Sequence, residues 1–172
     1  TSSAGRILAR YSMTAIAKAH PNIALVKYWG KRSEEEMLPD VGSISITVSG
    51  MLTTTRLSFA EEGELSADEI VLNGESRPEE TVKVSKWLDR FRAHWGKNRF
   101  AWVDSYNDFP TGAGLASSAS GFAALSAAAF AEAQLDVTSD DLTRWARRGS
   151  VSAARSFHGD RKSTRLNSSH QI

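Results

Sequence analysis

Pro110-Thr111-Gly112-Ala113-Gly114-Leu115-Ala116-Ser117-Ser118-Ala119-Ser120 is the stretch that decides how the rest of the chain is interpreted. It joins a strand predicted at residues 101–105 to an alanine-rich helix predicted to end near residue 132. Gly112 and Gly114 can adopt backbone angles closed to other residues, and the free N–H groups of a helix start attract anions. Three hydroxyls that can donate to phosphate or bind magnesium follow: Ser117, Ser118 and Ser120. We interpret the stretch as a phosphate-binding loop; the alternative is a serine-capped helix whose glycines serve only geometry.

Strands are predicted mainly before this loop. Residues 14–19 and 23–29 are apolar-rich and separated by a predicted turn, His20-Pro21-Asn22. Residues 43–48 and 53–59 alternate in polarity around Ser49-Gly50, which is typical of a hairpin. A further strand is expected at residues 69–72, before an Asn-Gly turn.

Helices are predicted around the loop and after it. Val84, Leu88, Phe91 and Trp95 recur at helical spacing, which predicts a helix that ends near Gly96. A last helix is expected after Thr138-Ser139, with acidic residues in its first turn and arginines toward its end at Gly149. Since the strands come early and the helices late, the predicted fold class is α+β.

The overall composition narrows the possible functions. The 172 residues carry 21 basic and 20 acidic side chains mixed along the chain, so no basic stripe indicates a nucleic acid or a membrane surface. The lack of cysteine excludes thiol chemistry, and the four histidines lack the spacing of a metal site. The sequence shows neither an apolar run of roughly 20 residues nor a signal-peptide pattern, so we expect a cytoplasmic protein.

A second anion-binding element is predicted at residues 21–32, where lysines and aromatics interrupt an apolar strand. On an extended segment Lys27, Trp29 and Lys31 share one face, and two ammonium groups there would repel unless an anion lay between them. The alternative is that each lysine lies flat and reaches water with its head group.

A third such element is the segment from Gly149 to Arg155, which offers two serine hydroxyls and a guanidinium group. Ser152 and Arg155 are spaced to share a helix face, and an arginine fork fits a phosphate well. The alternative is a serine-capped helix with a solvated arginine. Together the three elements could hold a nucleotide and a phosphorylated substrate separately.

The spacing Pro110-x-x-x-Gly114-Leu115-x-Ser117-Ser118-Ala119 resembles the ATP loop of the GHMP kinase superfamily. Three further motifs, in the family's order, make the chain similar to the diphosphomevalonate decarboxylase family. They are Asn-Ile-Ala-x-x-Lys-Tyr-Trp-Gly-Lys-Arg from Asn22, Ser-Ile-Ser-x-Thr-x-Ser from Ser43, and Arg-Arg-Gly-Ser-x-Ser-Ala-Ala-Arg-Ser from Arg147. The lysine and the serine–arginine motifs are the most diagnostic, because sugar and homoserine kinases do not carry them together.

The resemblance implies ATP-dependent decarboxylation of mevalonate 5-diphosphate to isopentenyl diphosphate, with release of ADP, phosphate and CO2. ATP and Mg²⁺ would be the cofactors, and the full-length protein would be a homodimer. The implied fold is the amino-terminal lobe: a mixed, twisted sheet with helices packed on one side, the carboxy-terminal lobe being absent. Two alternatives stay open: a decarboxylase or 3-kinase of mevalonate or its monophosphate, and an inactive truncated fragment.

Residue by residue, the resemblance assigns the substrate's diphosphate to Tyr28, Lys31, Ser150, Ser152 and Arg155. Lys27 matches the lysine at the reacting centre, and Asn22 and Trp29 support the substrate pocket. The ATP loop is matched by Gly112, Gly114, Ser117 and Ser118, with Ser120 as a further cofactor-binding residue. Ser118 is also expected near the reacting phosphate and the metal. The family's catalytic aspartate is expected beyond this chain.

The two ends depart from the family pattern. Residues 1–12 are expected to be an upstream extension or read-through, because Met13-Thr14-Ala15 resembles a family start. Residues 13–159 would form the lobe that binds ATP and substrate. Residues 160–172 resemble the in-frame translation of a sequencing-library adapter, against the alternative of a polar, disordered tail.

Overall fold

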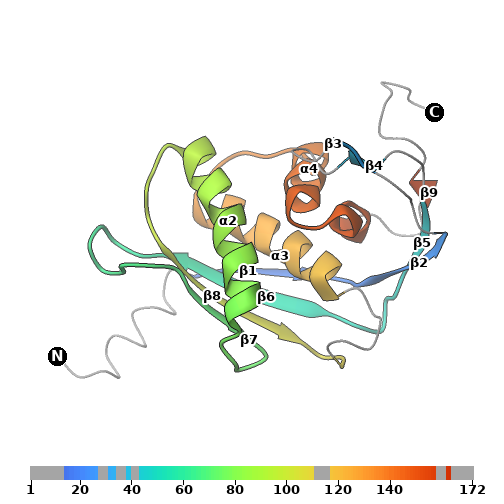
Figure 1. Cartoon of the computed structure of the whole chain (residues 1–172), viewed down its shortest axis with the longest axis horizontal. Helices are drawn as coiled ribbons and strands as arrows, with labels where there is room; N and C mark the ends of the chain where they lie inside the picture. Colours follow the sequence, from blue (N-terminus) through green and yellow to red (C-terminus); the bar gives the residue numbers. More distant parts are fainter. Residues whose placement is uncertain are drawn as a thin grey trace.

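A four-stranded mixed sheet forms the base of the fold in the computed structural model, which describes residues 14–26, 31–33, 38–39, 43–110, 117–157 and 162–163. Its strands lie in the order β1-β6-β8-β7, with β7 parallel to β8 and the other pairs antiparallel. Figure 1 shows the helices over one face of this sheet. The bounds are Ala15–Ala19 for β1, Thr53–Phe59 for β6, Glu69–Leu72 for β7 and Ala101–Asn107 for β8. The predicted mixed sheet with helices on one side is confirmed.

Alternation along β6 explains which face the helices cover. Thr53, Thr55, Leu57 and Phe59 are buried, whereas the side chain of Arg56 is exposed and pairs with Asp104 of β8 on the opposite face. Because successive side chains of a strand point to opposite faces, one face of the sheet is apolar and takes the helices.

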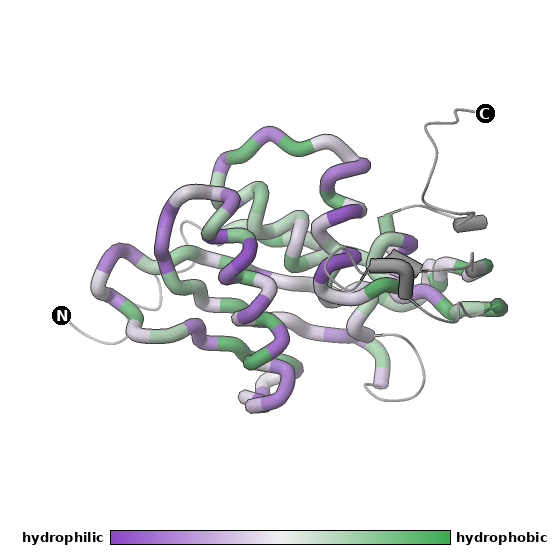
Figure 2. The backbone as a smooth tube through the Cα atoms, turned by 45° about the horizontal axis from the view of Figure 1, so that its top comes forward, coloured by the Kyte–Doolittle hydropathy of each residue, from purple (hydrophilic) through white to green (hydrophobic). Residues whose placement is uncertain are grey.

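In the part of the chain that the structure describes, the helices are α2 (Pro78–Trp95), α3 (Ser117–Glu132), α4 (Ser139–Gly149) and the 3₁₀-helix η1 (Val151–Phe157). The predicted apolar stripe of α2 is buried at Val84, Leu88 and Phe91, and Gly96 ends the helix with a left-handed φ of 74°. Figure 2 shows α3 coloured as hydrophobic along most of its length, while α2 and α4 carry hydrophilic stretches. The buried alanines of α3 let it pack closely on the sheet, as its composition predicted.

Aromatic side chains fill the space between α2, α3 and α4. The ring of Phe91 stacks on Trp87 and meets Phe130 and Trp145 edge-on. The indole N–H of Trp87 donates to the carbonyl oxygen of Trp145 at 2.9 Å, so this buried polar group is satisfied. Trp87 was missing from the predicted stripe because it lies beside Leu88 and widens the buried face.

Two smaller sheets lie apart from the main one: β2 (Asn22–Val26) with β5 (Ser43–Thr47) and β9 (Lys162–Ser163), and β3 (Lys31–Ser33) with β4 (Leu38–Pro39). The predicted hairpin of residues 43–48 with 53–59 is wrong, because β5 pairs with β2 whereas β6 pairs with β1 and β8. The turn at His20 likewise connects strands of two different sheets. The N–H of Val48 donates to the carbonyl of Pro21 at 2.9 Å, which draws β5 to the start of β2.

The ribbon formed by β2 and β5 has two unlike faces. Asn22 and Ser45 are buried, whereas Ile23 and its register partner Ile46 are exposed. The exposed large hydrophobic residues of the ribbon are Ile23, Leu25, Val26, Ile44 and Ile46. An exposed apolar sheet face of this kind marks an interaction surface. Within the described residues, no helix is both long and apolar enough to cross a membrane.

Candidate active site

The start of α3 and the start of η1 meet at three serines that we call the serine junction: Ser118, Ser150 and Ser152. The hydroxyl oxygens of Ser118 and Ser150 are 3.4 Å apart, and those of Ser150 and Ser152 are 3.1 Å apart. The predicted phosphate loop and the predicted serine–arginine turn are therefore neighbours in space.

The backbone explains how η1 presents its side chains. Ser150 caps α4 in an extended conformation, and its N–H still donates to the carbonyl of Ala146 at 3.1 Å. The chain then winds as a 3₁₀-helix with about three residues per turn, which places Ser152 and Arg155 one above the other. Ala153 and Ala154 are buried and hold the opposite side against the core. This winding agrees with the common face predicted for Ser152 and Arg155.

Asn22 connects strand β2 to the junction. Its side chain is 0% exposed, and its Nδ2 group donates to the carbonyl of Ser152 at 3.0 Å and to the hydroxyl of Ser156 at 2.9 Å. Its Oδ1 atom is buried and has no hydrogen-bond partner among the residues that the structure describes. A buried acceptor of this kind is costly unless a donor meets it. Asn22 thus both supports the turn and offers one acceptor beside it.

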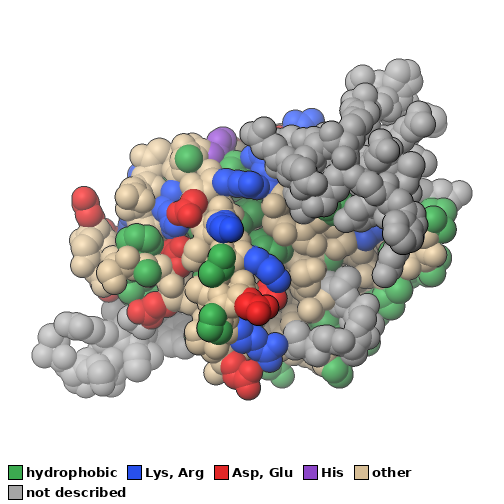
Figure 3. Space-filling model, in the orientation of Figure 1, with side chains coloured by type: hydrophobic (Ala, Val, Ile, Leu, Met, Phe, Trp, Pro, Cys, Tyr) green, Lys and Arg blue, Asp and Glu red, His purple; other side chains and the backbone are tan. Residues whose placement is uncertain are grey.

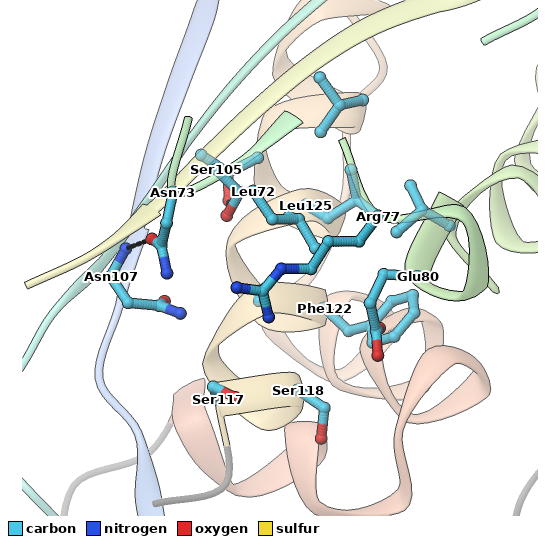
Figure 4. A pocket seen from close by; sticks show the side chains of 14 residues that line it. Leu72, Asn73, Arg77, Glu80, Ser105, Asn107, Ser117, Ser118, Phe122 and Leu125 are labelled. Atoms are coloured by element: carbon cyan, nitrogen blue, oxygen red, sulfur yellow. Dashed lines mark hydrogen bonds between the residues drawn. The ribbon is translucent and has the colours of Figure 1, made fainter. Parts of the chain in front are cut away.

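A cavity of about 130 Å³ opens beside the first turn of α3. Val84, Val103, Phe122 and Leu125 form its apolar wall, and polar side chains line the rest. Figure 4 shows Arg77 projecting into it from the start of α2, with Ser117 and Ser118 at one end and Asn73 and Asn107 at the side. A concave site with an apolar wall and a few polar groups is the usual form of a small-molecule pocket.

The sequence pattern did not predict the polar residues that line this cavity. Asn73 adopts a positive φ of 52°, and its Oδ1 atom accepts from the N–H of Asn107 at 2.8 Å. Arg77 pairs with Glu75 at 3.0 Å, and both side chains are exposed. The Asn-Gly turn and the position of Asn107 just before the loop were signals that could have indicated these residues.

Ser120 lies differently from the other two serines of the helix start. Its side chain is fully buried, and its hydroxyl accepts from the Thr53 hydroxyl at 2.6 Å and donates to the carbonyl of Ser117 at 3.3 Å. The hydroxyl faces β6 instead of the cavity, so we leave Ser120 out of the ligand set proposed below. The sequence could not separate it from Ser117 and Ser118, because helix rotation decides which serine faces the sheet.

Several predicted site residues lie outside the described residues: Lys27, Tyr28, Trp29, Gly112 and Gly114. Lys31 is described only by its backbone, as the first residue of β3. In the described residues β2 ends at Val26, and Lys31 begins β3 in a different small sheet. The shared face of Lys27, Trp29 and Lys31 stays a prediction, because residues 27–30 lie outside the described residues.

Charged side chains of both signs are mixed on the surface. On the face seen in Figure 3, Lys and Arg side chains are interspersed with Asp and Glu instead of forming one basic stripe. No group of three or more His, Cys, Asp or Glu side chains capable of holding a metal occurs in the described parts of the chain. The junction itself offers an anion the serine hydroxyls and the N–H groups at the start of α3, and Arg155 lies on the same 3₁₀-helix as Ser152.

Comparisons with known proteins all match this chain to one family. The model of the diphosphomevalonate decarboxylase-like N-terminal domain matches residues 19–170. The chain is 38% identical over 148 residues to the phosphomevalonate decarboxylase of Haloferax volcanii, covering 86% of this chain and 45% of that protein.

Solved structures agree with this match. Mevalonate diphosphate decarboxylase from Enterococcus faecalis is 42% identical with a TM-score of 0.78, over 90% of this chain and 51% of that one. A structure of MDDEF in complex with MVAPP, AMPPCP and magnesium is 41% identical with a TM-score of 0.77, over 90% and 50% of the two chains. The chain thus spans about half the length of the proteins it matches.

Proposed function

Because this chain belongs to the diphosphomevalonate decarboxylase-like family, we propose that the whole protein converts mevalonate 5-diphosphate to isopentenyl diphosphate at the expense of ATP. ADP, phosphate and CO2 are the other products. The observation that carries the proposal is the 3.4 Å separation of the Ser118 and Ser150 hydroxyls. It brings two predicted anion-binding elements together, and transfer of a phosphoryl group requires donor and acceptor in contact.

The nucleotide is assigned to the start of α3 and the cavity beside it. Ser117 and Ser118 lie at the positive end of the helix dipole, and both line the cavity. The triphosphate would extend from the cavity past these hydroxyls and the loop glycines Gly112 and Gly114. The complex of MDDEF with MVAPP, AMPPCP and magnesium supports ATP and magnesium as the ligands. Magnesium would neutralise charge on the phosphates, and the Ser118 hydroxyl is the ligand that we propose for it.

The diphosphate of the substrate is assigned to the other side of the junction. Ser150, Ser152 and Arg155 supply two hydroxyls and a guanidinium group, and Lys31 and Tyr28 complete the set by resemblance to the family. Lys27 would lie at the reacting centre, with Trp29 in the pocket wall. Asn22 keeps η1 in place through its two donated hydrogen bonds. The same complex of MDDEF with MVAPP supports mevalonate 5-diphosphate as the substrate.

The chemistry needs positioning and electrostatics more than covalent catalysis. Phosphorylation of the tertiary hydroxyl makes it a leaving group, its loss builds positive charge at carbon 3, and the neighbouring carboxylate leaves as CO2. Fixed donors that hold the diphosphate keep this carbon in reach of the nucleotide, and a dry site strengthens each charge interaction.

A second candidate function follows from the relative in Haloferax volcanii, a phosphomevalonate decarboxylase at 38% identity. Its substrate carries one phosphate fewer, and the same junction could serve it. We expect the whole protein to show a kcat/KM for mevalonate 5-diphosphate about tenfold or more above that for the 5-phosphate, since a second phosphate adds charge-assisted hydrogen bonds. Assays of the purified whole protein with both substrates decide between the two functions. Faster turnover of the monophosphate overturns the substrate assignment.

The 172-residue chain by itself is proposed to be inactive. It spans about half the length of its relatives, and the apolar outer face of the β2–β5 ribbon is uncovered. A surface of that kind is usually covered by another part of a protein. From the resemblance to the family we also propose that the whole protein is a homodimer and cytoplasmic, with the small-molecule substrate as its partner.

A further inference from the structure

Gly149, the last residue of α4, lies against Phe122 of α3. A Cβ atom built on Gly149 would overlap three ring carbons of Phe122, namely Cγ, Cδ1 and Cε1. Gly50 and Gly121, in contrast, have nothing within 4 Å of the same position. The contact of Gly149 with Phe122 therefore requires a residue without a side chain, for reasons of space and not of backbone angle.

The two residues that would overlap, Gly149 and Phe122, each lie close in sequence to a serine of the serine junction. Phe122 follows Ser118 by one helical turn, so the two side chains share a face of α3. Gly149 directly precedes Ser150, whose hydroxyl is 3.4 Å from that of Ser118. The ring of Phe122 is 6% exposed and also lines the cavity, so it cannot move away without disturbing that wall.

We propose that Gly149 is a positioning residue that sets the distance between the two halves of the junction. Its contact with Phe122 keeps the end of α4 against α3, and this places the Ser150 hydroxyl beside Ser118. The inference deepens the proposed function and rests on it for the identity of the two anions. The geometric part, a spacing set by Gly149, can be tested without any ligand.

The chain contains no cysteine, so a pair of introduced thiols reports one distance without interference. Ser118→Cys together with Ser150→Cys should form a disulfide when oxidised glutathione is added, because the two side chains already lie within reach. Each disulfide formed reduces one oxidised glutathione to two thiols. Adding Gly149→Ala should slow the cross-linking about tenfold or more, since a shift of about 1 Å strongly affects a contact reaction.

Two matched variants distinguish a change in the spacing of the serine junction from a general loss of folded structure. Gly50→Ala, placed where a Cβ meets nothing, should leave the cross-linking rate within about twofold of the parent pair. Phe122→Leu added to Gly149→Ala should restore at least about a third of the lost rate, because the smaller side chain makes room. Thermal unfolding followed by circular dichroism checks that each variant is folded at the assay temperature. If Gly149→Ala unfolds the chain, recovery of folding and cross-linking by Phe122→Leu is the supporting result.

Three outcomes overturn the proposal: no cross-link in the parent pair, an unchanged rate with Gly149→Ala, or no recovery with Phe122→Leu. A binding titration with inorganic pyrophosphate tests whether the spacing affects anion binding. Gly149→Ala should weaken pyrophosphate binding about tenfold. If the unmodified chain does not bind pyrophosphate while the cross-linking pattern is as expected, the proposed function fails and the spacing role stands.

Discussion

Replacing Arg155 with alanine raises the KM of the whole protein for mevalonate 5-diphosphate by about 10- to 100-fold. A hydrogen bond to a charged group contributes about 1.5–3 kcal/mol, and about 1.4 kcal/mol corresponds to a tenfold change in affinity. Arg155 lies in the last turn of η1, three residues after Ser152, and we assign η1 to the substrate. The KM for ATP should change much less, because the nucleotide is assigned to α3. Steady-state kinetics with each substrate varied in turn give both constants.

Arg144→Ala is the matched control for this experiment. Arg144 is an arginine of the preceding helix whose side chain is 63% exposed and pairs only at 3.6 Å with Asp141. Its replacement should leave both KM values within about twofold, as expected for a surface substitution. Lys31→Ala is expected to behave like Arg155→Ala. A larger effect of Arg155→Ala on the KM for ATP than on that for the diphosphate would contradict the assignment of the two subsites.

Replacing Asp68 with asparagine should lower the free energy of unfolding of the 172-residue chain by about 3 kcal/mol or more. Asp68 and Arg92 form a two-pronged ion pair at 2.9 and 3.1 Å, and their side chains are 2% and 5% exposed. Asp68 also accepts from the N–H of Ala101 at 2.9 Å, which attaches α2 to the start of β8. Removing the carboxylate leaves the positive charge of a buried guanidinium group without its main opposite charge. Breaking a buried ion pair in this way is strongly destabilising.

The pKa of Arg92 shows how the pair is held. Burial by itself lowers this pKa, but the hydrogen bonds and charges of Asp68 and Asp89 offset burial and raise the pKa overall. The guanidinium group therefore stays charged in the folded chain. Urea unfolding should show a lower midpoint for Asp68→Asn at an unchanged slope.

Asp89→Asn provides the control within the same network. Asp89 contacts the same Arg92 but is 69% exposed, so its loss should cost no more than about 1 kcal/mol. Equal destabilisation by the two substitutions would show that burial does not decide the strength of this pair.

Much of the fold could be predicted from local pattern. The stripe of α2 is set by side chains that repeat every three or four positions, and α3 is indicated by its run of alanines, which favour helix. Thr138 also caps α4 as expected, accepting from the N–H of Asp141 at 3.2 Å. Such features depend on neighbours in sequence, which is why the sequence indicates them directly.

The pairing of strands could not be predicted in the same way. Residues 43–59 have the alternation and the turn of a hairpin, yet β5 pairs with β2, whereas β6 pairs with β1 and β8. These partners are distant in sequence, and alternation says nothing about them. The loop and the serine–arginine turn were predicted as separate elements, and their contact at Ser118 and Ser150 is likewise a product of tertiary packing. The spacing role of Gly149 depends on a ring that comes from another helix.

The central claim is tested most directly by following CO2 release when the whole protein is supplied with ATP, magnesium and mevalonate 5-diphosphate, with the 172-residue chain as the inactive control. We expect one CO2 and one isopentenyl diphosphate for each ADP, and none of either without ATP. Formation of ADP and a phosphorylated mevalonate derivative without CO2 would contradict the claim and identify a kinase instead.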